Sequence, residues 1–177
     1  MSDQDKIYIA YYKPEGIEST LNKNIANNLA DAIPIQERLF PLGRLDKSSE
    51  GLMILTNDGK IYNGVTNSKN HKEKEYEVKV DLAISDEFIQ KMSSGIEIMG
   101  QITKPCIVKK TDQNTFNIIL TQGLNRQIRR MCYKLNFNVI SLKRLRIMNI
   151  TLGELRPGEF RYLSREEIYH LQVGVEI

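Results

Sequence analysis

Residues 43–59, GRLDKSSEGLMILTNDG, combine two opposite charges, a short polar loop, an apolar run and a turn. The run LMIL at residues 52–55 predicts a buried strand, and the NDG that follows is typical of a tight turn. Before this strand, Arg44 and Asp46 are separated by one residue, so on an extended strand both side chains point to the same side. A neighbouring arginine keeps a carboxylate ionised at neutral pH, as a nucleophile or general base requires. A surface ion pair would give the same pattern, so the segment alone leaves both interpretations open.

The chain length and composition fit a globular protein without a metal centre. A length of 177 residues is enough for one domain with a core, with room for two lobes. Cys106 and Cys132 lie far apart and the two histidines are isolated, so their spacing suits neither a zinc site nor a disulfide framework. No apolar stretch approaches the ~20 residues of a membrane span, and the first residues, MSDQDK, do not resemble a signal peptide. These features favour a cytoplasmic location.

The positive charge is concentrated in one part of the sequence. The formal net charge of the chain is +3. Residues 124–146 contain no Asp or Glu and carry seven cations: Arg126, Arg129, Arg130, Lys134, Lys143, Arg144 and Arg146. A basic block in an otherwise slightly acidic protein indicates a polyanionic partner such as RNA, although a solvated helix face is the alternative.

A helix is predicted over residues 125–135, and its faces have different characters. At about 100° per residue, Ile128, Met131, Cys132 and Leu135 form one apolar stripe. Three residues lie opposite this stripe and face solvent or a ligand: Arg126, Arg130 and Tyr133. Arg129 lies at the border, where it could reach into a cleft while its neighbours contact phosphates.

The remaining pattern predicts more strands than helices. Helical spacing occurs over residues 24–33 and 60–66, after a Ser85 N-cap, and after a Ser164–Glu167 capping box. Strands are predicted over residues 7–11, 75–80, 96–110, 115–121, 138–142 and 145–150. Because few βαβ alternations occur, the prediction is an α+β fold with a mixed, mostly antiparallel sheet and flanking helices.

Four motifs occur in an order that resembles a known family. GRLD followed by S-x-G-L is at residues 43–52, KEKEYEVKV at 72–80, GLNRQIRRMC at 123–132 and YYKPEG at 11–16. Together they resemble the RsuA family of RNA pseudouridine synthases. One departure is Tyr12, at a position where the family usually has asparagine. A second is that the small S4 RNA-binding domain of many members is not present in this sequence.

The resemblance implies a fold and a reaction. The fold is the pseudouridine synthase fold, with a central RNA-binding cleft, and residues 1–177 form the catalytic domain. The reaction breaks the bond from the ribose C1′ to N1 of uracil, and the base turns and reattaches through C5. Since this isomerisation involves no redox change and no phosphate transfer, no cofactor and no metal are expected, in agreement with the absence of a P-loop motif.

The resemblance also assigns roles to individual residues. Asp46 is the catalytic carboxylate, which attacks C1′ or removes a proton from C2′. Tyr76 lies against the uracil and helps to remove the C5 proton, and Arg129 pairs with Asp46 and orients it. Arg44 helps to flip the target nucleotide from its stack, and Leu145 lines the uracil pocket or simply packs in the core. The candidate phosphate contacts are Arg126, Arg130, Lys143, Arg144, Arg146, Lys74, Lys72 and Lys69.

Alternatives to this function share parts of the pattern. The most favoured substrate is 23S ribosomal RNA, and tRNA is a second possibility for the same chemistry. A catalytically inactive ribosome-assembly protein would have the same basic surface but would not need Asp46, Tyr76 and Arg129 together. A nucleosidase-like hydrolase would use the carboxylate but would not need the basic block. A monomer is expected on the grounds of family alone.

Overall fold

The computed structural model describes residues 6–66 and 72–176, which form two compact units. Unit 1 comprises Met1–Asn70 and Arg146–Ile177, and unit 2 comprises His71–Leu145. Each unit combines antiparallel strand pairs with short helices, as the α+β prediction requires.

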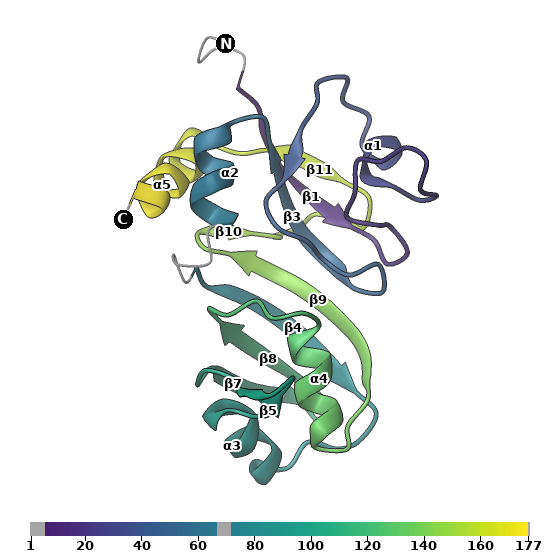
Figure 1. Cartoon of the computed structure of the whole chain (residues 1–177), viewed down its shortest axis with the longest axis vertical. Coiled ribbons are helices and arrows are strands. Elements are labelled where there is room, and N and C mark those ends of the chain that lie inside the picture. The colour runs from purple at the N-terminus through teal and green to yellow at the C-terminus, as the bar shows by residue number, and fades with distance from the viewer. Residues whose placement is uncertain (1–5, 67–71, 177) are drawn as a thin grey trace. The chain divides into compact units, whose positions relative to one another are not determined.

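Unit 1 is built on a sheet whose central strands are covered on both faces. β1 (Tyr8–Lys13) pairs antiparallel with β11 (Phe160–Tyr162) on one side and with β3 (Glu50–Thr56) on the other, and the short β2 (Phe40–Pro41) also pairs with β3. All six residues of β1 are buried, because helices cover one face and the segment around α1 (Leu29–Ala32) covers the other. Figure 1 shows α2 (Gly59–Thr66) and α5 (Arg165–Glu176) side by side on the face opposite α1. The core on the helical side contains Tyr8, Ala10, Tyr12, Leu52, Ile54, Ile61, Val65 and Leu171.

Unit 2 contains a four-stranded sheet with two helices packed on its core. The strand order is β9 (Val139–Ile147, whose last two residues belong to unit 1), β4 (Lys74–Val80), β8 (Thr115–Leu120) and β7 (Ile107–Asp112). The alternation predicted along β4 is confirmed, since Val78 and Val80 are buried while Lys79 is exposed. Both α3 (Asp86–Ser94) and α4 (Gln127–Lys134) contribute to the same core, which contains Val78, Val80, Phe88, Met92, Phe116, Ile118, Ile128, Met131 and Cys132.

The predicted helix over residues 24–33 is largely wrong. Helical structure is limited to α1 at its C-terminal end. Asn27 adopts a positive φ of 57°, which is incompatible with a continuing helix, and the side chain of Asn28 accepts a hydrogen bond from the backbone N–H of Asp31 as a helix N-cap. The apolar spacing in this segment therefore reflects burial of its last turn only.

The predicted strands over residues 96–110, 138–142 and 145–150 are also corrected. The first is interrupted by a turn at Met99 and Gly100, with φ values of 48° and 77°, which separates β5 (Glu97–Ile98) from β6 (Gln101–Ile102). The other two form the single strand β9, followed by the short β10 (Ile150–Thr151). Lys143 and Arg144 do not interrupt β9, because strand backbone pairing tolerates a charged side chain on either face.

Both predicted helix caps are confirmed. The Ser85 hydroxyl accepts a hydrogen bond from the Phe88 backbone N–H at 3.1 Å, and α3 ends at Gly95, whose φ is 116°. Ser164 and Glu167 form a reciprocal capping box before α5: the Glu167 N–H donates to the Ser164 hydroxyl at 3.1 Å, and the Ser164 N–H donates to the Glu167 carboxylate at 2.9 Å.

Glu167 makes stability depend on pH. Arg161 donates to both of its carboxylate oxygens, at 2.7 and 2.9 Å. These bonds, together with that from the Ser164 N–H, hold the pKa of Glu167 below its usual range. A lowered folded-state pKa stabilises the fold above the unfolded value of about 4.3 and ceases to do so as pH falls through the folded value. We expect Glu167→Gln to reduce the free energy of unfolding by about 1 kcal/mol at pH 7.

Urea unfolding at pH 7, 5 and 3 tests this expectation. The difference between wild type and Glu167→Gln should shrink towards pH 3, because the carboxylate of the unfolded chain is protonated there and the advantage of the lowered folded-state pKa declines. The exposed Glu154 of unit 1 supplies the control, since Glu154→Gln should change the free energy of unfolding by less than about 0.5 kcal/mol at each pH. A Glu167→Gln difference that is constant from pH 7 to pH 3 would contradict the role of the ionised carboxylate.

Candidate functional site

Arg44 and Asp46 lie in an irregular segment and not on a strand, which corrects the prediction. β2 ends at Pro41, Gly43 adopts a φ of 92° that strands do not use, and β3 begins only at Glu50. Burial still alternates across the segment: Arg44 is exposed, Leu45 is buried and Asp46 is half-buried. The buried leucine thus anchors a short loop that carries the two charged side chains.

Backbone hydrogen bonds on both sides of Asp46 fix the position of this loop. The hydroxyl of Ser19 donates to the Leu45 carbonyl at 2.5 Å and accepts from the Leu45 N–H at 3.0 Å. The Ser49 N–H donates to the carbonyl of Asp46 itself at 2.9 Å. Because Ser19 is buried, these bonds are shielded from water and hold the backbone that carries the carboxylate.

A buried lysine holds the other end of the same loop. Lys13, at the end of β1, is fully buried, and its Nζ donates to the carbonyls of Pro14 at 3.0 Å, Ile17 at 2.7 Å and Lys47 at 3.4 Å. The Gly16 N–H donates to the same Lys47 carbonyl at 2.7 Å, in a turn where Gly16 has a φ of 98°. The KPEG part of the YYKPEG motif therefore connects the end of β1 to the Asp46 loop.

Tyr12, the residue that departs from the family pattern, has a defined place in the core of unit 1. Its ring is buried among the residues that α2 and α5 cover. Its hydroxyl donates to the carboxylate of Glu50 at 2.6 Å, and Glu50 is the first residue of β3. The tyrosine thus links β1 to the start of the strand that follows the Asp46 loop.

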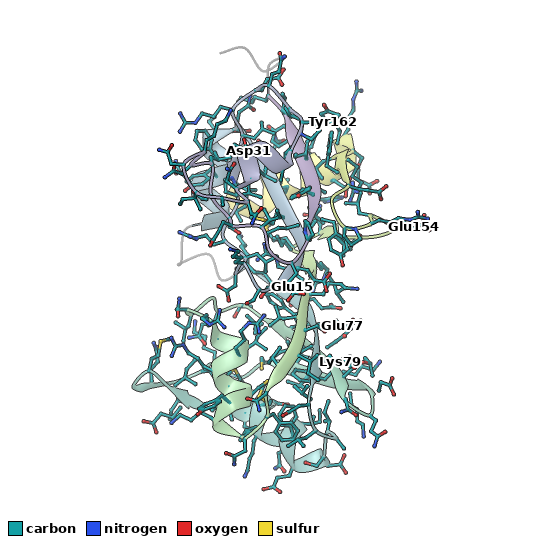
Figure 2. All side chains as sticks on the ribbon, turned by 90° about the vertical axis from the view of Figure 1, so that its right-hand side faces the viewer. Glu15, Asp31, Glu77, Lys79, Glu154 and Tyr162 are labelled. Carbon is teal, nitrogen blue, oxygen red and sulfur yellow. The ribbon has the colours of Figure 1, made fainter. Side chains whose placement is uncertain are left out.

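In unit 2, Tyr76 lies on β4 at the edge of the core. It pairs with Ile118 of β8, is half-buried, and packs against the core to which α4 contributes. Figure 2 labels its neighbours Glu77 and Lys79, whose side chains extend away from α4. Strand alternation places Tyr76 on the other face of β4. The buried residues of α4 pack against this same face.

The faces of α4 are as predicted. Ile128, Met131 and Cys132 are buried, whereas Arg126, Arg130 and Tyr133 are exposed, and Arg129 has intermediate burial at the border. Burial raises the pKa of the Cys132 thiol to about 12, and the positive charge of Arg129 opposes that rise. The helix begins after Arg126, whose φ is 49°, and the Gln127 side chain accepts from the Leu124 N–H at 3.1 Å.

A pocket of about 420 Å³ lies beside α4, entirely within unit 2. Three cations of α4 line this pocket, together with Arg126, the residue before the helix. None of the described residues in its lining carries a carboxylate. Its lining comprises Ile98, Met99, Arg126, Arg129, Arg130, Tyr133, Lys134, Phe137, Asn138 and Val139. We call this the α4 pocket. The pocket brings together three of the predicted arginines. Met99 and Phe137 were not predicted as site residues, and Met99 was missed because the β5–β6 turn that brings it here was not recognised.

The other predicted RNA contacts differ in exposure. Arg144 is only 2% exposed, which argues against the predicted phosphate contact, because a phosphate in solution reaches exposed guanidinium groups. Burial first, and the charge of Arg144 second, lower the pKa of Lys74 on the neighbouring strand β4. Lys143 is half-buried, and Arg146 donates to the Met148 carbonyl at 2.8 Å. Lys72 has intermediate burial, and Lys69 lies outside the described residues.

The predicted catalytic residues are divided between the two units. Arg44 and Asp46 share one loop of unit 1, while Tyr76, Arg129 and the half-buried Leu145 of β9 belong to unit 2.

Neither cysteine competes with Asp46 as a nucleophile, because burial raises the pKa of Cys106 to about 11 and that of Cys132 to about 12. Within residues 6–66 and 72–176 no cluster of three metal-ligating side chains occurs, and none of the helices there is both long and apolar enough to span a bilayer.

Comparison with known proteins identifies the family. The family model for RNA pseudouridylate synthase matches residues 7–134, which include the Asp46 loop, Tyr76 and the whole of α4. The chain belongs to the RNA pseudouridylate synthase family. This confirms the resemblance that the four motifs indicated.

Curated and solved members of the RNA pseudouridylate synthase family give the extent of the similarity. The chain is 47% identical over 167 residues to a protein of Salmonella typhi named dual-specificity RNA pseudouridine synthase RluF, and 46% identical over 168 residues to the protein of that name from Escherichia coli K12. These matches cover 94% and 95% of this chain but 58% of each relative, so the chain spans less than two thirds of their length. A crystal structure of a pseudouridylate synthase, 30% identical, superposes with a TM-score of 0.88 over 94% of this chain and 74% of that one, which confirms the predicted fold.

Proposed function

We propose that the chain is an RNA pseudouridine synthase with Asp46 as its catalytic carboxylate. The observation that carries the proposal is the Asp46 loop: a half-buried carboxylate follows an exposed arginine by two residues, on a loop whose backbone is held by Lys13, Gly16, Ser19 and Ser49. A catalytic group needs such a fixed position, whereas a surface ion pair does not. Family membership supports the choice of reaction.

The reaction uses this chain's own side chains as follows. Asp46 either attacks C1′ of the ribose or removes a proton from C2′, and the C1′–N1 bond breaks. The freed uracil turns, and a bond forms between C5 and C1′ while the Asp46–C1′ bond breaks or, in the second route, the proton returns from Asp46 to C2′. The C5 proton then leaves and N1 gains one, so product and substrate are isomers and Asp46 is regenerated. Tyr76 assists the removal of the C5 proton, and Arg129 pairs with Asp46 and orients it. Arg44 displaces the target from its stack, and Leu145 contacts the uracil.

The substrate in this proposal is RNA, with 23S ribosomal RNA as the principal target and tRNA as the second. The relatives of about 46% identity are named dual-specificity RNA pseudouridine synthases, which supports testing two RNAs. Exposed cations on α4 supply contacts to the phosphate backbone, which position an RNA without reading its sequence. The protein acts as a cytoplasmic monomer in this proposal.

The test is to incubate the protein with unmodified 23S ribosomal RNA and with unmodified tRNA, and to map pseudouridine by carbodiimide labelling and primer extension. We expect a new stop at a defined uridine in at least one RNA. Release of free uracil without a new stop would instead indicate a glycosidic hydrolase. Absence of both products, with salt-dependent RNA binding intact, would indicate a protein that only binds RNA.

A further inference from the structure

We propose that the α4 pocket binds an unpaired nucleotide of the RNA that neighbours the target uridine, with its base stacked on Tyr133 and its phosphate held by Arg126 and Arg130. This subsite rests on the proposed function in taking RNA as the ligand and in the role given to Arg129. All of its lining residues belong to unit 2.

The charge of the pocket favours an anion. Arg126, Arg129, Arg130 and Lys134 line it, and the described residues of its lining include no carboxylate. Like charges three and four residues apart on a helix repel one another and destabilise the helix. A phosphodiester bound among them reduces that repulsion, so the pocket favours a polyanion over a neutral ligand.

Arg130 is already oriented for such a phosphate. Its Nε donates to the Asn125 carbonyl at 3.0 Å, and its Nη2 donates to the Asn125 side-chain oxygen at 3.0 Å. A guanidinium carries five N–H donors, so these two bonds fix the plane of the group while other donors can bind a phosphate. Because the side chain is ordered before RNA arrives, less conformational entropy is lost on binding.

The pocket also offers an apolar surface of the size of a base. The Tyr133 ring is 73% exposed although it is a large aromatic side chain, and Met99 is 48% exposed. The β5–β6 turn, with Met99 at a φ of 48°, brings the thioether to the same pocket, and the half-buried Phe137 completes its apolar part. Stacking of a base on an exposed ring is worth about 1–3 kcal/mol in single-stranded RNA complexes. The volume of about 420 Å³ is within the range of small-molecule sites.

The position of Tyr133 on α4 indicates which nucleotide binds. Tyr133 lies one helical turn, about 6 Å, after Arg129, which the proposed mechanism pairs with Asp46, the group that reacts with the target uridine. A base stacked on Tyr133 therefore belongs to a neighbouring nucleotide of an unpaired segment, since bases within a duplex are not accessible to an aromatic ring.

The absence of tryptophan from the sequence makes a direct test possible. In Tyr133→Trp the new indole is the only tryptophan, and we expect a ten-nucleotide single-stranded RNA to quench its emission by half or more, with saturation. With one phosphate contacted, the dissociation constant should rise at least about 2.5-fold between 50 and 200 mM salt. The matched control is Ile107→Trp, at a 61% exposed position of β7 in the same unit, which should not be quenched. Equal quenching of both variants, or none in Tyr133→Trp while filter binding shows the RNA bound, would overturn the subsite.

Enzyme kinetics and a second polyanion test the subsite independently of this quenching. In multiple-turnover assays Tyr133→Ala should raise KM about tenfold with kcat within twofold, and Tyr133→Phe should restore KM, because stacking needs the ring and not the hydroxyl. If polyglutamate quenches Tyr133→Trp and RNA does not, the pocket binds an acidic protein instead and the subsite is wrong. If RNA quenches it but pseudouridine forms in neither RNA, the proposed function fails while the subsite stands.

Discussion

Asp46→Asn is expected to lower the rate of pseudouridine formation about 10⁴-fold while RNA affinity stays within about twofold. The amide has the size of the carboxylate but can neither form a covalent bond to C1′ nor accept a proton, and loss of a nucleophile or base typically has an effect of this size. The backbone bonds from Ser19 to Leu45 and from Ser49 to residue 46 do not involve the carboxylate, so the loop should keep its position. Single-turnover assays and filter binding measure the two quantities.

The control for Asp46→Asn is Glu15→Gln, which removes an exposed carboxylate from the neighbouring turn. It should retain the wild-type rate and thereby exclude a general effect of reduced negative charge. A rate for Asp46→Asn within tenfold of wild type would show that another group performs the chemistry. Loss of RNA binding in Asp46→Asn would indicate that the carboxylate supports the fold rather than the reaction.

Sequence reasoning predicted most reliably the features that depend on neighbouring residues. The alternation along β4, the Ser85 N-cap and the Ser164–Glu167 capping box were predicted because each pattern extends over a few residues and carries its own hydrogen bonds. The border position of Arg129 on α4 followed from helical geometry alone. The family motifs then supplied the roles that no local pattern could supply.

The failures have a common physical origin in backbone conformations that residue types do not disclose. Asn27, Met99 and Arg126 all adopt positive φ, and each ends or delays an element that the apolar pattern would continue. Such conformations are uncommon for residues other than glycine, so a pattern-based prediction extends the helix or strand past them. The missed β5–β6 turn is why the α4 pocket could not be predicted as a complete site.

Burial of charged residues was the other missed feature, because side chains that are far apart in sequence determine it. Lys13 ends an apolar run and resembles a strand-terminating surface lysine, but its ammonium is enclosed by carbonyls of residues up to 34 positions away. Arg144 was predicted to contact phosphate, which requires an exposed guanidinium, and it is buried. In both cases the fold, and not the local pattern, decides where the charge lies.

Lys13→Met is expected to reduce the free energy of unfolding by about 2–4 kcal/mol and to lower kcat more than it changes KM. Methionine can fill the space of the lysine stem but donates no hydrogen bond, so the carbonyls of Pro14 and Ile17 lose the donor that Lys13 provides. The Lys47 carbonyl keeps the Gly16 N–H, so the loop should loosen rather than detach. Misplacement of a catalytic group by a fraction of an ångström is enough to slow a reaction strongly.

Chemical denaturation and steady-state kinetics at 15 °C, where the variant remains folded, test both parts of this expectation. Lys47→Met removes an exposed lysine side chain from the same loop but leaves its carbonyl in place, and should change the free energy of unfolding by less than about 0.5 kcal/mol. If Lys13→Met unfolds like wild type, the three carbonyl contacts do not stabilise the loop. If it is destabilised but kcat is unchanged, Lys13 supports the fold of unit 1 without positioning Asp46, and the bonds from Gly16, Ser19 and Ser49 would have to fix the loop.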